Sequence, residues 1–322
     1  MLKKLAMVFA TFMLALVTAA CGSNNATDKT SGAQPEAAKQ TAPVEITVKH
    51  ELGETVVKKN PQKVVVFDFG SLDTMDALGV EPVGLPQKSL PSYLDKYKDE
   101  KYINVGGLKE PDFEKIHEAK PDLIIIAGRQ ADKYEEFKKI APTIYMDVDD
   151  KKYMESFTTK VKTLAQIFDK EAKADEMLAK IEKEIKDLNE KTKADEKKAL
   201  VILANDGKVS AYGSTSRFGI VHDVFGFKQA DDKIGASTHG QSVSFEYILE
   251  KNPDYIFVVD RTAAIKKGES SAKQVIENEI VKKTNAVKNN KVIYLDPGYW
   301  YLSGGGLESV SEMVKETDAV YK

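Results

Sequence analysis

The sequence predicts an α/β protein of two duplicated lobes, each with a central, mostly parallel sheet, joined by a long helical connector. Three observations predict this fold: an internal repeat, near-continuous runs of Val and Ile, and a central segment without Gly or Pro. Such apolar runs are typical of parallel strands that helices cover on both faces. Two lobes of this kind would bring the carboxyl ends of their strands to a shared cleft.

The repeat appears when residues 110–129 (EPDFEKIHEAKPDLIIIAGR) are aligned with residues 242–261 (SVSFEYILEKNPDYIFVVDR). Eight of the twenty positions are identical, and the alignment has no gap. Each copy follows a strand-like run, KVVVFDF or KALVILAN, and precedes a helix and a run that ends alike, TIYMD or VIYLD. We interpret the repeat as the duplication of one lobe that contains strand, helix, strand, helix and strand.

Residues 153–197 are expected to form the connector. From Tyr153 to Lys198 the chain has no Gly or Pro, and its apolar residues recur at helical spacing. Asp169 and Lys170 are expected to separate two helices. A helix of about twenty residues spans roughly 30 Å, the diameter of a small domain. A coiled coil is the alternative interpretation of the same spacing.

The first residues predict a lipoprotein signal peptide and a tether. Residues 1–20 contain two lysines, an apolar stretch too short to span a bilayer and a small-residue cleavage site. Cys21, the only cysteine, follows as in a bacterial lipobox, and two acyl chains on it would anchor the protein to a membrane. An ordinary secretory signal is the alternative. Residues 21–44 are small and polar and are expected to form a flexible tether, which leaves lobes at 45–152 and 198–322.

Composition and motifs argue against several functions. The 47 basic and 50 acidic residues give a net charge of −3, which argues against a general nucleic-acid binder. The sequence has no GxSxG elbow, no Walker loop, no dinucleotide fingerprint and no His pair at metal spacing. We therefore expect no enzymatic activity, no cofactor and no metal held by the protein's own side chains. We also expect a monomer.

Arginine is rare in this chain, and its positions indicate an anionic ligand. Only Arg129, Arg217 and Arg261 occur among 47 basic residues. Arg129 and Arg261 occupy the same position of the repeat, where the runs IIIAG and IFVVD end, and Arg217 lies in the loop YGSTSRFG. A planar, permanently charged guanidinium group suits carboxylate, phosphate or catecholate oxygens. The alternative is that the arginines form structural salt bridges within their own lobes.

Other candidate ligand-binding residues lie in the loops around the expected cleft. The stretch DPGYWYLSGGG contains Tyr299, Trp300 and Tyr301, three consecutive aromatic residues that suit stacking against an aromatic ligand. Packing of one or two of them in the core is the alternative. The remaining candidates, each of which has an ordinary surface or loop role as its alternative, are His239, Gln241, Tyr212 and Lys88.

The lipobox, the tether, the duplicated lobes and the connector resemble the siderophore-binding lipoproteins of ABC importers in Gram-positive bacteria. More narrowly, VVVFDFGSLDTMDALGV, GGLKEPDFEKI, STSRFGIVHDVFG, STHGQSVSFEYI and WYLSGGGLES resemble the ferric-petrobactin-binding members of bacilli and their relatives. The resemblance implies a class III periplasmic-binding-protein fold at the outer face of the cytoplasmic membrane. In GLPQKSLP the chain departs from the pattern, because Gln87 stands where a Lys is expected and Lys88 follows.

The resemblance also implies a ligand and partners. Petrobactin presents two catecholate groups and a citrate unit to iron, so the siderophore holds the metal. Members of the family deliver the ferric siderophore to a permease and its ATPase, and they dock through one exposed Glu on each lobe. The repeat nominates Glu114 and Glu246 for this role, with Glu118 and Glu250 as the second choice. A Glu that stabilises a helix N-terminus is the alternative.

Three other functions stay open at this point. The ligand could be haem, cobalamin or another chelate such as a hydroxamate siderophore. A lipid-anchored hydrolase would need a nucleophile and a base, and the nearest pair, His239 with Ser242 or Ser244, has no acidic residue beside it in the sequence. A surface adhesin or scaffold would bind no small ligand.

Overall fold

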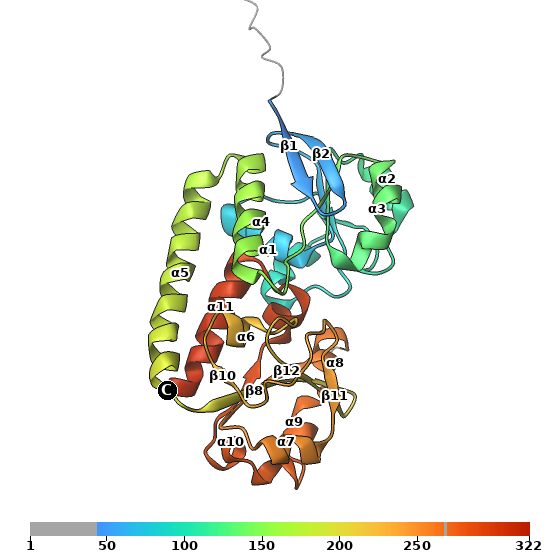
Figure 1. The fold of residues 1–322 in the computed structure, drawn as a ribbon. Helices are drawn as coiled ribbons and strands as arrows, with labels where there is room; N and C mark the ends of the chain where they lie inside the picture. The colour runs from blue at the N-terminus through green and yellow to red at the C-terminus, as the bar shows by residue number, and fades with distance from the viewer. Residues whose placement is uncertain (1–43, 267–268) are drawn as a thin grey trace, which may run out of the picture. The chain divides into compact units, whose positions relative to one another are not determined.

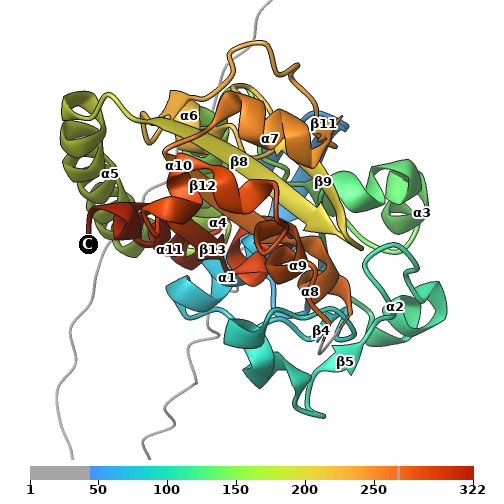
Figure 2. The same cartoon turned by 90° about the horizontal axis from the view of Figure 1, so that it is seen from below.

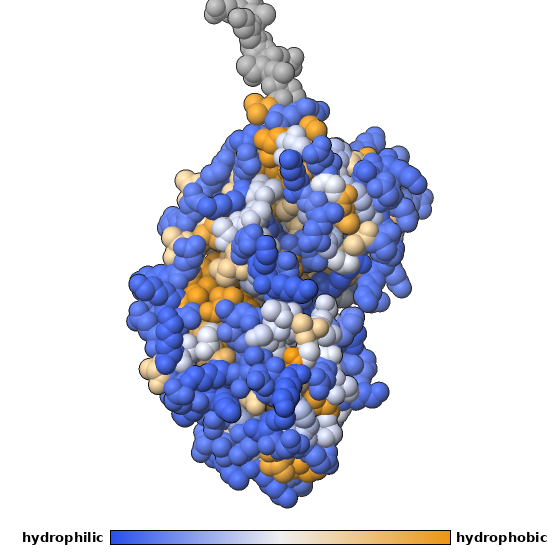
Figure 3. All heavy atoms as spheres, viewed as in Figure 1, coloured by the Kyte–Doolittle hydropathy of each residue, from blue (hydrophilic) through white to orange (hydrophobic). Residues whose placement is uncertain are grey.

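The computed structural model describes residues 44–266 and 269–322. The predicted signal peptide, Cys21 and the tether up to residue 43 lie outside the described residues. Within the described ranges, no helix combines the length and the apolar character that a membrane crossing requires. The face seen in Figure 3 is mainly hydrophilic, with its apolar groups in separate patches.

The first central sheet is parallel throughout. Its strand order is β5-β4-β3-β6-β7, which places the repeat strand β6 beside β3. An antiparallel hairpin of β1 and β2 precedes it. The strands are β1 (Glu45–His50), β2 (Gly53–Lys58), β3 (Val64–Val66), β4 (Gly84–Leu85), β5 (Ile103–Asn104), β6 (Leu123–Ile126) and β7 (Thr143–Tyr145).

The second central sheet is mixed, in the order β11-β9-β8-β12-β13, with β10 also paired to β8. Strands β8, β10, β12 and β13 run parallel, and β9 and β11 run antiparallel to their neighbours. The predicted mostly parallel α/β fold is therefore confirmed, and the hairpin of β8 and β9 is an addition to it. The strands are β8 (Lys198–Asn205), β9 (Lys208–Tyr212), β10 (Lys228–Gln229), β11 (Gln241–Val243), β12 (Tyr255–Asp260) and β13 (Val292–Leu295).

Helices cover both faces of each sheet (Figures 1 and 2). In the second sheet, Ile202 and Val258 face a core shared with α7, α9 and α10, whereas Val201 and Phe257 face the core shared with α5 and α11. The helices are α1 (Phe69–Leu78), α2 (Phe113–Ala119), α3 (Tyr134–Lys138), α4 (Tyr153–Phe168), α5 (Glu171–Ala194), α6 (Ile220–Asp223), α7 (Phe245–Lys251), α8 (Arg261–Ile265), α9 (Ala272–Ile276), α10 (Asn285–Lys288) and α11 (Leu307–Asp318). Shorter 3₁₀ segments are Ser92–Lys98, Gly128–Lys133, Val281–Lys283 and Ala319–Tyr321, and Gly298–Leu302 is a π-helical turn.

The sequence repeat has a structural cause. Helices α2 and α7 each end at a residue in the left-handed region, Lys120 or Asn252, and a Pro-Asp pair follows. The carboxylate of Asp122 accepts hydrogen bonds from the main-chain N–H groups of Gln62 and Lys63, at 2.8 and 2.9 Å. The equivalent Asp254 accepts one from Lys198 at 3.1 Å. Each aspartate therefore ties a repeat strand to the start of its neighbour.

Two helices occupy the predicted connector. Helix α4 ends at Phe168, Asp169 follows with φ +52°, and α5 begins at Glu171, so the expected break lies where it was predicted. Helix α5 packs along α4 and α11 (Figure 1). Helix α11, near the end of the chain, packs in turn against α1 of the first half. The two halves are thus joined by packing as well as by the chain itself.

Gly207→Ala is expected to lower the free energy of unfolding by about 1 kcal/mol, because Gly207 has φ +74° and alanine is strained there. An added Cβ would meet nothing within 4 Å, so no steric clash contributes to the loss. Gly235→Ala is the matched control, since its Cβ also meets nothing and its φ is outside the left-handed region. Urea denaturation followed by circular dichroism measures both variants, and equal losses would contradict the assignment.

Candidate functional site

The three arginines meet at one residue, Tyr301. Arg129 and Arg217 each donate a hydrogen bond from Nη2 to its main-chain carbonyl, at 2.8 and 2.6 Å. Arg261 donates from Nε to its phenolic oxygen at 2.8 Å. The guanidinium carbon of Arg217 lies 4.2 Å from the centroid of the Tyr301 ring. Guanidinium groups that are far apart in the sequence therefore share a single partner.

Salt bridges within the lobes do not account for these arginines. Across residues 44–266 and 269–322, no carboxylate lies within ion-pair distance of Arg129, Arg217 or Arg261. None of their acceptors is a carboxylate: they are the carbonyls of Tyr301 and Leu302, the hydroxyl of Tyr301, and the side-chain oxygen of Asn205, which accepts from Arg261 at 2.7 Å. Three positive charges are thus held together without a directly paired negative charge.

The fold explains how each arginine reaches this point. Arg129 follows strand β6, and Arg261 follows strand β12 as the first residue of α8, so both lie at strand ends as the repeat predicts. Arg217 arrives by a different route, because strand β9 separates it from β8. Tyr301 belongs to the π-helical turn after β13. The cluster is therefore assembled from the ends of several strands.

Two hollows open at the arginine cluster, with volumes of about 250 and 350 Å³, and both are lined by Arg217, Thr238 and Tyr301. Arg129 lines the first hollow, and Arg261 lines the second. We call the two together the arginine cleft. Another cavity of about 270 Å³ lies beside Lys49 and contains none of these arginines.

The charges in the cleft act on one another. The pKa of Arg129 is lowered by burial and by the charge of Arg217. Burial raises the pKa of Tyr301, but the hydrogen bond from Arg261 and the three guanidinium charges outweigh it and lower this pKa below its ordinary value. A positive potential that favours the anionic form of a phenol would favour the oxygens of an anionic ligand in the same place.

Residues 64–299 match the family model described as periplasmic binding protein. The chain belongs to the periplasmic binding protein family. It is 55% identical over 320 residues to the petrobactin-binding protein YclQ of Bacillus subtilis strain 168, and the match covers 98% of each chain. It is also 34% identical over 295 residues to the ferric-anguibactin-binding protein FatB of Vibrio anguillarum, which covers 89% of this chain and 92% of FatB.

Solved structures of binding proteins agree with the fold. The crystal structure of the petrobactin-binding protein YclQ from Bacillus subtilis matches with a TM-score of 0.85 and 58% identity, over 87% of this chain and 99% of YclQ. The siderophore-binding protein BauB, solved with two molecules of acinetobactin and ferric iron, matches with a TM-score of 0.80 and 33% identity, over 87% of this chain and 99% of BauB. The predicted family and fold class are both confirmed.

The three consecutive aromatic residues of this binding protein point in different directions. The sequence suggested a loop, but Gly298–Leu302 is a helical turn, which sends neighbouring side chains to different sides. Trp300 is buried, lines the first hollow, and donates from its ring nitrogen to Glu316 at 2.7 Å. Tyr299 packs on Tyr93, with 4.5 Å between ring centroids, and lines neither hollow of the arginine cleft. Tyr301 alone lies among the arginines.

The other predicted binding residues also fall into two groups, those that line the arginine cleft and those that do not. Tyr212 and His239 line the second hollow. Gln241, at the start of strand β11, and Lys88 are exposed and line neither hollow. The side chain of Gln87 donates to the main-chain carbonyl of Tyr97 at 2.8 Å, so it is held in the first half of the chain.

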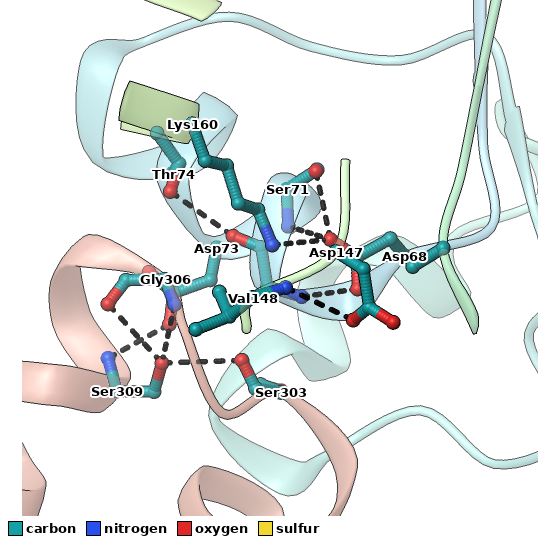
Figure 4. Close-up of polar contacts among 12 residues, drawn as sticks. Asp68, Ser71, Asp73, Thr74, Asp147, Val148, Lys160, Ser303, Gly306 and Ser309 are labelled. Atoms are coloured by element: carbon teal, nitrogen blue, oxygen red, sulfur yellow. Dashed lines mark hydrogen bonds and ion pairs between the residues drawn. The ribbon is translucent and has the colours of Figure 1, made fainter. Parts of the chain in front are cut away.

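Sequence reasoning missed the acidic residues of the first hollow, Asp68, Asp147 and Asp150. Asp68 is buried and accepts from the ammonium group of Lys160 at 2.6 Å and from the hydroxyl of Ser71 at 2.7 Å (Figure 4). Burial raises the pKa of Asp150 to about 6, although the charge of Arg217 opposes this. A signal was present, because Asp68 and Asp147 each follow a buried strand of the first sheet.

Tyr301 is expected to ionise at a lower pH than an ordinary tyrosine, because the arginines stabilise its phenolate. The difference between the ultraviolet absorbance titrations of the wild type and Tyr301→Phe isolates this group. Tyr294→Phe gives the matched comparison, since burial raises the pKa of Tyr294. Arg261→Gln should move the Tyr301 titration upward, and an unchanged titration would show that the 2.8 Å hydrogen bond is absent in solution.

Proposed function

We propose that this chain captures an anionic ferric siderophore, petrobactin or a similar catecholate and citrate chelate, in the arginine cleft and delivers it to an ABC permease. The convergence of Arg129, Arg217 and Arg261 on Tyr301, without a paired carboxylate, is the observation that carries the proposal. The names of the relatives YclQ, FatB and BauB support the ligand class.

The chemistry of the cleft supports an anionic chelate. The guanidinium groups donate to oxygens that belong to no carboxylate, and a negatively charged oxygen in the same place would add direct charge attraction to the hydrogen bond. A chelate with several negative oxygens could accept from Arg129 of the first half and from Arg217 and Arg261 of the second. A ligand of this kind would bridge the two halves. We assign the iron ligands to the siderophore and none to protein side chains.

The proposal includes a location and partners. We infer that the chain works as a monomer at the outer face of the cytoplasmic membrane, anchored by lipid at Cys21, without a cofactor or catalytic activity. Its partners would be the permease and the ATPase of an importer. Glu114 and Glu246 are exposed in the first turns of α2 and α7, at equivalent positions of the repeat, and we propose them as the permease contacts.

Arg129→Gln and Arg261→Gln are each expected to weaken the binding of ferric petrobactin about ten- to hundredfold, the effect of losing a charge-assisted hydrogen bond. The fluorescence of Trp300, the only tryptophan, measures the affinity, because this residue lines the first hollow and a nearby iron complex should quench it. Lys180→Gln, an exposed change on α5, is the control and should leave binding unchanged.

The same titration separates the ligand classes. The affinity of the wild type is measured under the same conditions for ferric petrobactin, a ferric hydroxamate siderophore, ferric citrate and haem. Tight binding of a ferric catecholate supports the proposal. Binding of haem or the hydroxamate alone, or the absence of any binding, would contradict it.

Reversing both proposed permease contacts, Glu114→Lys with Glu246→Lys, is expected to abolish uptake and to leave the affinity for ferric petrobactin unchanged. Uptake of radioactive iron is measured in cells in which the variant is the sole binding protein for this ligand. The pair Glu118→Lys with Glu250→Lys is the comparison, because these residues are also exposed and equivalent in the repeat. Full uptake by the first double variant would disprove the assignment.

A further inference from the structure

A side chain from the first half of the chain caps the start of α11, near the end of the chain. Gly306 precedes α11 and has no side chain that could accept the free N–H groups of its first turn. Asp73 of α1 accepts them instead, from Glu308 to Oδ1 at 2.7 Å and from Ser309 to Oδ2 at 2.8 Å. Figure 4 shows Asp73 beside Gly306 and Ser309. One carboxylate therefore joins the two halves through two main-chain hydrogen bonds.

The two segments touch so closely that both need glycine. A Cβ added at Gly306 would lie 2.3 Å from the carboxyl carbon of Asp73. A Cβ added at Gly70, also in α1, would lie 2.7 Å from the main-chain oxygen of Ser303. The backbone at Ser303 therefore lies directly on Gly70 of α1, and Gly306 lies directly against the side chain of Asp73.

Asp73 is completely buried, and its two oxygens are occupied. The hydroxyl of Tyr93 donates to Oδ2 at 2.8 Å, in addition to the two main-chain donors. Burial raises the pKa of Asp73 to about 6, and hydrogen bonds from Glu308, Tyr93 and Ser309 oppose this effect. At neutral pH the carboxylate is therefore mostly ionised, and it carries the charge that suits a helix N-terminus.

The capped segment leads directly into the arginine cleft. Tyr301 stands five residues before Gly306. Its carbonyl accepts from Arg129 and Arg217, and the carbonyl of Leu302 accepts from Arg129 at 3.4 Å. The segment is thus held at one end by Asp73 and at the other end by the arginines.

We propose that Asp73 is a positioning residue for the arginine cleft: by fixing the start of α11 on α1, it sets where Tyr301 presents its acceptors to the arginines. This inference rests on the proposed function, because its consequence is measured as siderophore affinity. Asp73 itself lines neither hollow and would not touch the ligand.

Asp73→Asn is expected to weaken the binding of ferric petrobactin about tenfold, because an amide has one acceptor oxygen and its NH₂ group would face a main-chain donor. Asp76→Asn is the matched control on the same helix. Asp76 accepts from the hydroxyl of Tyr97 at 2.8 Å and pairs with Lys96, so its contacts stay within the first half. This control should bind ferric petrobactin as the wild type does.

The Tyr301 titration tells positioning apart from a loss of stability alone. In Asp73→Asn, folded as judged by circular dichroism, the pKa of Tyr301 should rise toward its ordinary value because the phenol no longer lies beside Arg261. Should Asp73→Asn fail to fold, Gly306→Ala disturbs the same contact from the other side, and it should weaken binding and shift the titration in the same direction.

The outcomes for the two proposals differ. A wild type that binds no ferric siderophore would overturn the proposed function. The positioning role alone would be overturned by a different result, in which the wild type binds ferric petrobactin. In that result, a folded Asp73→Asn or Gly306→Ala variant binds it equally well and has an unchanged Tyr301 titration.

Discussion

Like charges repel, and this chain nevertheless gathers all of its arginines around a single tyrosine. Burial and the charge of Arg217 both lower the pKa of Arg129, which means that the arrangement costs free energy in the folded protein. The arginines donate to the carbonyl and the phenol of Tyr301 and to the side chain of Asn205, and none of these acceptors is a carboxylate. An anionic ligand bound at this site would reduce the repulsion between the guanidinium groups. The strands, the hairpin and the contact of α11 with α1 hold the arginines and Tyr301 together.

Duplication supplies two of the three arginines, and separate features supply the rest. Arg129 and Arg261 follow equivalent strands because each half repeats the same strand, helix and strand. Arg217 has no counterpart in the repeat, and it depends on the hairpin that adds β9 to the second sheet. Tyr301 is held from the first half through Arg129 and, further along the chain, through the contact of α11 with Asp73. The strands that carry Arg129 and Arg261 are thus related by the repeat, whereas Arg217 and Tyr301 have no equivalent in the first half.

The sequence predicted the features that arise from local patterns. Residue spacing predicted the repeat, the Val and Ile strands and the break at Asp169, because each depends on near neighbours in the chain. The hairpin of β8 and β9 was missed although Asp206-Gly207 is a strong turn signal, with both residues at positive φ. The cap on α11 by Asp73 was beyond sequence reasoning, since no spacing rule relates two segments so far apart. The sequence also did not predict which aromatic residue faces the arginines, among Tyr299, Trp300 and Tyr301. The answer depends on a helical turn in a stretch that has the composition of a loop.

The use of arginine in a lysine-rich chain follows from the same electrostatics. A buried ammonium group beside two other positive charges would readily give up its proton, whereas a guanidinium group keeps its charge even when its pKa falls. Among the described residues one lysine is buried, Lys160, and its ammonium group lies 2.6 Å from the carboxylate of Asp68. In the part of the chain that the structure describes, no carboxylate is paired in this way with Arg129, Arg217 or Arg261. Lys160 with its counter-ion is part of the protein's framework, whereas in the proposed function an anionic ligand would serve as the counter-ion of the arginines.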